Sequence, residues 1–229
     1  MRLKLLTKKQ ETKDVTSFVF EYPEGSSYTA GQFFHYVLHH RPTDDRGSDR
    51  FFTNAAAPFE KQVRITTRET KETGSSFKKK LFSLVEGKTI EVSNMSGDFV
   101  LSEGNAEHVF IAGGIGITPF RSILAELSHK GAMPHITLLY ANKDKDNIVY
   151  KEELETIAAQ FPTFKIMYVF SPEHIDEKKI KEVFPDFAKK IFYVSGPEPM
   201  VDALGETLKT MGLPEEQIKQ DWFPGYPQE

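Results

Sequence analysis

A glycine-rich turn joins an apolar run to a longer segment with helical periodicity, and it is the first place where chemistry is expected. The run HVFIA (108–112) precedes GGIGITP (113–119), and the apolar periodicity ends at Gly131. We expect Thr118 to be the helix N-cap and Pro119 to take the first helical position, where its missing N–H costs nothing. The free N–H groups and the helix dipole would attract a phosphate, so we interpret the stretch as a nucleotide-binding turn.

This turn matches the dinucleotide fingerprint G-x-G-x-x-G in part. Gly114 and Gly116 fill the first two positions, but Pro119 stands where a glycine normally lets the helix pack closely on the strand. An ordinary strand-to-helix connection is therefore the alternative. YANK (140–143) and SGPEPM (195–200) also follow strand candidates. Because ligands of doubly wound sheets bind beyond the carboxyl ends of the strands, the three segments predict one crevice that fits a dinucleotide.

Two patterns of elements would position that crevice. Up to about residue 100, short runs rich in β-branched and aromatic residues predict a small antiparallel barrel or sandwich, with one helix over 75–85. From about 105, apolar strands alternate with helices, which predicts a doubly wound parallel sheet covered on both faces. We expect a barrel domain at 1–102 and an α/β domain at 103–229. The predicted strands are 3–10, 16–22, 31–40, 63–69 and 88–94, then 108–112, 135–141, 164–170, 190–195 and 217–223, and the later helices are 119–130, 148–160, 177–184 and 199–211.

The composition excludes several functional classes. The 229 residues are 39% hydrophobic and 27% charged, as in a soluble globular protein, and a net charge of −4 without a basic stripe argues against nucleic acid. No apolar run approaches the roughly 20 residues that cross a bilayer, and the seven histidines show no metal-ligand spacing. The absence of cysteine excludes disulfides and a cysteine-held iron–sulfur cluster within this sequence, and it fits the reducing cytoplasm.

Five motifs, in this order, resemble the ferredoxin–NADP reductase superfamily of flavin-dependent oxidoreductases. They are RFFTNAAAP (50–58), GSS (74–76), GDF (97–99), GGIGITP (113–119) and SGPEPM (195–200). The resemblance covers nearly the whole chain. It implies a flavin-binding barrel and a nicotinamide-binding α/β domain, with FAD preferred to FMN because the cluster-free two-domain form usually carries FAD.

The resemblance assigns the flavin to residues of the barrel. Arg50, Phe52 and Thr53 match the family motif Arg-x-aromatic-Ser/Thr: the guanidinium would pair with phosphate, the ring would lie against the isoalloxazine, and the hydroxyl would approach N5. The family more often has tyrosine at the position of Phe52, so a hydrogen bond to the ribityl chain would be missing. The residues implied to bind flavin are Arg50, Phe51, Phe52, Thr53, Asn54, Ile65, Thr66, Thr67, Gly74, Ser75 and Ser76.

Each of these motifs also has a purely structural interpretation. Taken alone, RFFT is an edge-strand arginine beside core aromatics. Ser75 or Ser76 would in either case be the N-cap of the helix that follows.

On the nicotinamide side, the resemblance implies that the glycine-rich turn holds the pyrophosphate. Ser195 stands where the family commonly has a cysteine near the reacting carbon. It could hydrogen-bond there, but we expect no proton transfer, because hydride transfer needs alignment more than an acid or base. Otherwise it is a serine that closes a strand before a Gly-Pro turn. The implied residues are Gly114, Ile115, Gly116, Thr118, Ser195, Gly196, Pro197 and Met200, and the candidate catalytic residues are Thr53 and Ser195.

Cofactor choice and the C-terminal aromatics are inferred in the same way. NADP-specific members tend to have an arginine soon after a serine at the end of the third strand, but SPEH (171–174) has none, and Glu173 would repel a 2′-phosphate. We therefore expect NADH rather than NADPH, although Lys143 and Lys145 could compensate. Trp222 or Phe223 is the candidate to cover the flavin. Packing of these aromatics onto the barrel is the alternative.

The predicted function is a flavin-dependent oxidoreductase that passes hydride from NAD(P)H to bound FAD and then electrons to a separate acceptor. That acceptor would be a ferredoxin- or flavodoxin-type protein, an oxygenase component or a small molecule, and the protein would be a monomer or homodimer. One alternative is an NAD(P)-dependent dehydrogenase without flavin, which needs the glycine-rich turn but not Arg50, Phe52 and Thr53. Another is a non-catalytic partner protein that binds nucleotide.

Overall fold

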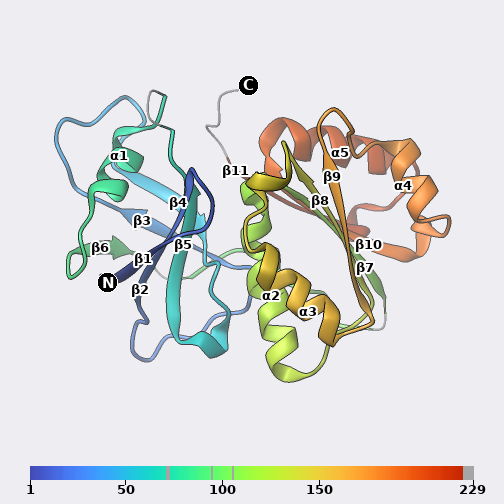
Figure 1. Ribbon diagram of the computed structural model, residues 1–229, viewed down its shortest axis with the longest axis horizontal. Coiled ribbons are helices and arrows are strands. Elements are labelled where there is room, and N and C mark those ends of the chain that lie inside the picture. The colour runs from blue at the N-terminus through green and yellow to red at the C-terminus, as the bar shows by residue number, and fades with distance from the viewer. Residues whose placement is uncertain (71–72, 94, 105, 224–229) are drawn as a thin grey trace.

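The computed structural model describes residues 1–70, 73–93, 95–104 and 106–223. Of Phe223 it describes only the backbone. Its first part is an antiparallel sheet with the strand order β4-β3-β6-β1-β2-β5 (Figure 1). The strands are β1 (Arg2–Gln10), β2 (Val15–Glu21), β3 (Phe33–Val37), β4 (Asp49–Thr53), β5 (Gln62–Arg68) and β6 (Thr89–Val92).

The two edge strands of this sheet meet just after β4. The Ala55 N–H donates to the Arg64 carbonyl over 2.9 Å, and the Asn54 Oδ1 accepts from the Arg64 N–H over 2.8 Å. These bonds close the sheet into the predicted barrel. Strand β4 was not among the predicted strands, because its two adjacent phenylalanines hide the alternation of buried and exposed side chains.

Helix α1 (Ser76–Ser83) covers the barrel core as the sequence predicts. The Ser75 hydroxyl caps it by accepting from the Lys78 N–H over 3.3 Å. Phe77 and Leu81, one helical turn apart, are fully buried among aromatic and aliphatic side chains of the barrel strands. This packing holds the start of α1 close to β4, one of the edge strands of the sheet.

The second part is the predicted parallel sheet, with the strand order β11-β10-β7-β8-β9. Its strands are β7 (Glu107–Gly113), β8 (Ile136–Asn142), β9 (Phe164–Phe170), β10 (Lys190–Pro197) and β11 (Ile218–Phe223). Helices α2 (Ile117–Lys130) and α3 (Lys151–Gln160) cover one face, and α4 (Glu177–Val183) and α5 (Glu198–Thr210) cover the other (Figure 1). The strands from β7 to β9 are added toward one edge of the sheet, and β10 and β11 are added on the other side of β7, so the strand order reverses between β7 and β10.

The two parts meet along α2, which lies between the barrel and the parallel sheet (Figure 1). Strand β6 ends at Val92 and β7 begins at Glu107, so the predicted domain division at 102/103 falls between the two sheets and stays a prediction. In the described part of the chain, none of the helices is long and apolar enough to cross a membrane.

The start of α2 differs from the sequence prediction. A short 3-10 turn (Gly114–Gly116) leads directly into the helix, whose N-cap is Gly116 rather than Thr118. Gly114 has φ +49°, a conformation that favours glycine and lets the chain curl immediately after β7. Thr118 is therefore already helical, and its hydroxyl donates to the Ile115 carbonyl over 3.2 Å. The predicted end of the helix at Gly131, with φ +62°, is confirmed.

Candidate functional site

A cavity of about 660 Å³ lies between the barrel and the parallel sheet. The barrel supplies its wall from β4, β5 and the start of α1, and the α/β part supplies the turn after β7 and the end of β11. The lining residues are Phe33, Arg46, Asp49, Arg50, Phe51, Phe52, Thr53, Thr66, Thr70, Thr73, Gly74, Ser75, Lys78, Ile115, Thr118, Asp221 and Trp222. The hollow beneath residues 50–53 is therefore open.

Strand β4 presents two kinds of side chain to this region. Arg50 and Phe52 are half-buried, and Phe52 packs edge to face on Tyr36 with ring centres 5.8 Å apart. The Arg50 guanidinium donates to the Arg46 carbonyl over 2.6 Å and also to the Asp49 carbonyl. Phe51, by contrast, is 59% exposed. Because Arg50 and Phe52 are two residues apart, the strand aims a cation and an aromatic ring at the same cavity.

One end of the cavity is cationic. Arg46, Arg50 and Lys78 line it together with the start of α1 at Gly74 and Ser75. A side chain at position 74 would collide with the Thr70 carbonyl, so the backbone there has no room for any residue but glycine. Cations beside a helix N-terminus form the chemical environment that a phosphate group requires.

The other wall is built from the glycine-rich turn. Ile115 and Thr118 reach the cavity, while Gly116 packs directly behind them on the Ser195 carbonyl, where a Cβ would collide. Gly113 and Gly196 lie against each other, and Met200 covers both. These glycines are needed for close packing of β7 on β10, which brings the turn to the edge of the cavity.

Ser195 lies in the parallel sheet between Ala112 of β7 and Asp221 of β11. Its side chain is fully buried, and its hydroxyl has no hydrogen-bond partner among the described residues. Buried polar groups are normally paired, so this hydroxyl is an exception.

Asp221 is a site residue that the sequence did not suggest. Its carboxylate lines the cavity and accepts a hydrogen bond from the Thr53 hydroxyl over 3.4 Å. Burial, with a smaller contribution from the charge of Asp98, raises the pKa of Asp221 to about 7. An acidic residue directly before Trp222 and Phe223, near the end of a predicted strand, was the available signal, but its pairing with Thr53 could not be read from it.

The structure places the predicted flavin and nicotinamide residues in two groups. Those on the cavity are Arg50, Phe51, Phe52, Thr53, Thr66, Gly74, Ser75, Ile115, Thr118 and Trp222. Those that do not line it are Asn54, Ile65, Thr67, Ser76, Gly114, Gly116, Ser195, Gly196, Pro197 and Met200. Trp222 is 47% exposed, and the side chain of Phe223 lies outside the described part of the chain.

Two of the residues that do not line the cavity have structural partners. Asn54 closes the barrel through Arg64, and Ile65 belongs to the barrel core. Arg46 and Lys78 are cavity residues absent from the prediction, although basic residues flanking the RFFT motif and GSS could have been noted.

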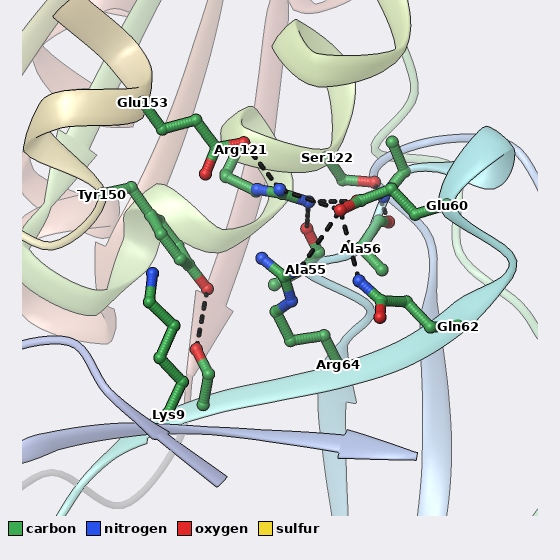
Figure 2. A network of polar contacts seen from close by, with 12 residues as sticks. Lys9, Ala55, Ala56, Glu60, Gln62, Arg64, Arg121, Ser122, Tyr150 and Glu153 are labelled. Atoms are coloured by element: carbon green, nitrogen blue, oxygen red, sulfur yellow. Dashed lines mark hydrogen bonds and ion pairs between the residues drawn. The ribbon is translucent and has the colours of Figure 1, made fainter. Parts of the chain in front are cut away.

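The same interface also contains a polar network formed by Glu60, Arg121, Ser122, Tyr150 and Glu153, which we call the Arg121 network (Figure 2). Arg121, on α2, is 5% exposed. Its guanidinium forms ion pairs with Glu60 of the barrel and with Glu153 of α3, the latter over 2.6 Å, and donates to the Ala55 carbonyl over 3.0 Å. The Tyr150 hydroxyl forms a hydrogen bond with the hydroxyl of Thr66, and Thr66 also lines the cavity.

The cavity fits a flavin on the evidence of its own wall. Aromatic and threonine side chains from β4 and β5 border it, and three cations line one end. A flavin has matching parts, a flat largely apolar ring system and a phosphorylated tail. No group of three or more His, Asp or Glu side chains suited to a metal occurs among the residues that the structure describes.

The fold, with a cavity between the barrel and the parallel sheet, is shared with several known reductases. Residues 110–206 match the family model of the oxidoreductase NAD-binding domain. The fold is shared with a cytochrome P450 reductase from Amycolatopsis (TM-score 0.83, 20% identity, 97% of this chain and 70% of that one). It is also shared with the ferredoxin–NADP+ reductase of Plasmodium falciparum (TM-score 0.81, 18% identity, 97% and 95% coverage).

Sequence relatives agree with this fold. The chain is 26% identical to the ferredoxin reductase component of a 3-ketosteroid-9-alpha-monooxygenase from Rhodococcus rhodochrous, over 93% of its length and 62% of the relative. It is 28% identical to a Burkholderia flavohemoprotein, over 94% of its length and 57% of the relative. It thus spans about six-tenths of these relatives. The chain is therefore similar to these reductases in fold, and residues 110–206 match their NAD-binding domain family.

Proposed function

We propose that this chain is an FAD-dependent NAD(P)H oxidoreductase that delivers electrons to a separate acceptor. The observation that carries the proposal is the shared cavity: Arg50 and Thr53 reach it from the barrel, and Ile115 and Thr118 reach it from the turn after β7. A dehydrogenase without flavin would have no use for the cationic and aromatic barrel wall.

Each part of the wall has a task in binding. Arg50 and Lys78 would hold a phosphate of the flavin, Phe52 and Thr66 would border its ring, and the Thr53 hydroxyl would donate to a ring nitrogen. When bound, the flavin supplies the chemistry, because it accepts hydride from the nicotinamide and can release electrons one at a time. The protein contributes alignment of the two ring systems and exclusion of water.

We further propose NADH as the preferred donor. Glu173 follows β9, in the region where a 2′-phosphate would need a cation, and its carboxylate forms an ion pair with Lys179 of α4. A phosphate placed there would meet a carboxylate that has already engaged the adjacent lysine. This arrangement supports NADH over NADPH.

The proposed acceptor is a separate redox protein, such as a ferredoxin or an oxygenase component, or a small molecule. The names of two relatives support a carrier role. One is the ferredoxin reductase component of a monooxygenase, and another, from Neisseria meningitidis, is one component of a Na(+)-translocating NADH-quinone reductase. The absence of cysteine from the 229 residues supports a reducing compartment such as the cytoplasm.

The test is reconstitution with flavin and replacement of Arg50. Wild-type protein should bind FAD, and anaerobic NADH should bleach its visible absorbance. Arg50→Ala should weaken FAD binding by about 10- to 100-fold, because charge-assisted hydrogen bonds contribute about 1.5–3 kcal/mol. Arg2→Ala, which removes an exposed arginine paired with Glu91, should leave it unchanged.

Three outcomes would contradict the proposal. The wild type could bind no flavin, Arg50→Ala could bind it as tightly as the wild type, or bound flavin could resist reduction by both NADH and NADPH. The last outcome would favour a non-catalytic protein that only binds nucleotide. Relative reduction rates with NADH and NADPH test the donor preference directly.

A further inference from the structure

The carboxylate of Asp44, in the loop before β4, is bound at the start of helix α1, beside the cationic end of the cavity. The Ser76 N–H donates to Asp44 Oδ2 over 2.8 Å, and the Asp44 N–H donates to the Ser76 hydroxyl over 3.0 Å. These reciprocal bonds tie residue 44 to the first turn of α1. Asp44 therefore occupies one of the N–H groups that a helix N-terminus offers to an anion.

Arg46 is held by the same carboxylate. Its guanidinium donates to Asp44 Oδ2 over 3.0 Å and to the Thr73 carbonyl over 3.1 Å. Arg46 lines the cavity, and so do Gly74 and Ser75, which immediately precede the residue bound by Asp44. The bond from the Ser76 N–H, assisted by Arg46, lowers the pKa of Asp44 to about 2. The group is thus negatively charged at any working pH.

The consequence depends on how many phosphates a flavin carries. One phosphate can be held by Arg50 and Lys78, which also line the cavity. A second phosphate that extends toward the start of α1 meets a fixed negative charge, and it finds the Ser76 N–H and the Arg46 guanidinium already engaged. Like charges at close range in a partly buried site oppose each other strongly.

We propose that Asp44 is a specificity-determining residue that acts against the second phosphate of a flavin dinucleotide. The Asp44 carboxylate occupies the position at the start of α1 where a second phosphate would bind. A flavin mononucleotide, with one phosphate, therefore binds with loop 44–47 unchanged. A dinucleotide gains Arg46 and the Ser76 N–H only when the carboxylate withdraws. This inference rests on the proposed flavin binding and concerns the relative affinities of FAD and FMN.

The competing interpretation is that Asp44 only caps α1. Asp44→Asn separates the two, because the asparagine side-chain oxygen can still accept from the Ser76 N–H while the charge is removed. Asp45→Asn is the matched control, since it makes the same charge change at the adjacent, exposed position. Asp44→Ser, which also retains a capping oxygen, serves if the asparagine variant folds poorly.

The experiment measures equilibrium binding of FAD and of FMN to flavin-free wild type and to each variant, by quenching of flavin fluorescence. We expect Asp44→Asn to bind FAD about tenfold more tightly or better, while its affinity for FMN changes by less than about threefold. Asp45→Asn should match the wild type with both flavins. Thermal unfolding with added inorganic pyrophosphate provides a second readout, in which only the Asp44 variants should gain stability.

An unchanged ratio of FAD to FMN affinity in Asp44→Asn, or weaker FAD binding, would overturn the inference and leave Asp44 as a cap. An equal effect of Asp45→Asn would also overturn it, because the effect would then reflect net charge alone. Failure of the proposed function looks different: neither flavin would bind to the wild type or to any variant.

Discussion

The interface between the barrel and the parallel sheet has two regions of opposite character. In the Arg121 network, buried charges meet protein partners on both sides of the interface (Figure 2). In the cavity, Asp221 has only the Thr53 hydroxyl as a described partner, and the nearby Ser195 hydroxyl has none. The first region fixes how the two parts of the molecule sit together, and the second is left for a ligand.

Burial acts on both regions but with different results. At Arg121 burial alone would lower the pKa, yet the hydrogen bond to Glu60 and the charges of Glu153 and Glu60 outweigh it and raise the pKa above its ordinary value. At Asp221 burial dominates and raises the pKa to about 7. A buried charge is retained where partners surround it, and proton binding is favoured where they do not.

The largest expected effect is in the Arg121 network. Arg121→Ala should lower the free energy of unfolding by about 3–5 kcal/mol, because it leaves Glu60 and Glu153 without their shared buried partner. Urea unfolding at neutral pH measures it. Lys130→Ala, which removes an exposed ion pair with Glu126 on the same helix, should cost no more than about 1 kcal/mol. Equal losses in the two variants would show that the network does not hold the interface.

The next effect concerns Asp221 and its dependence on pH. The ordinary pKa is 3.8 and the folded value is about 7, so between these values the folded state binds more protons than the unfolded state. The free energy of unfolding should therefore fall as pH rises from 4 to 7, by up to about 4 kcal/mol. Asp221→Asn should lose this slope in the flavin-free protein.

Denaturant titrations at several pH values measure that slope. Asp202→Asn, which changes an exposed aspartate on α5, should keep the wild-type dependence. If Asp221→Asn also kept it, the cavity would not impose the burial that its geometry implies.

The smallest expected effect compares two fully buried serines, Ser122 of the Arg121 network and Ser195 on the strand beside Asp221. Ser122 donates to the Ala56 carbonyl over 2.6 Å, so Ser122→Ala should cost about 1–2 kcal/mol. Ser195→Ala removes a hydroxyl with no described partner and should leave stability unchanged or slightly higher. Thermal unfolding of the two variants, measured side by side with the wild type, gives the loss of stability caused by each substitution. A comparable loss at Ser195 would mean that its hydroxyl is already satisfied.

Most of the fold could be predicted from local patterns. The five strands of the parallel sheet, the helices that cover it and α1 all follow from hydrophobic periodicity and turn residues. The start of α2 was wrongly predicted, because a 3-10 turn permitted by Gly114 moves the helix entry from Thr118 back to Gly116. Capping preferences describe single residues and do not register such a turn.

The candidate site was predictable where a motif is contiguous. Arg50 and Thr53 sit in one strand, and both reach the cavity. Arg46, Lys78 and Asp221 reach the same cavity from a loop, a helix and a distant strand, and no short pattern joins them. Asp44 has no sequence signal either, because an aspartate in a polar loop resembles any solvated residue until α1 is placed beside it.

The sequence by itself determined the two architectures and the glycine-rich turn, because strand and helix formation depend on neighbours within a few residues. Only the tertiary structure decided which groups share a cavity. Thr53 and Asp221 are 168 residues apart and meet through the packing of β11 beside the barrel. Their contact depends on how the two parts dock, and docking is set by buried surfaces and ion pairs that come from all along the chain.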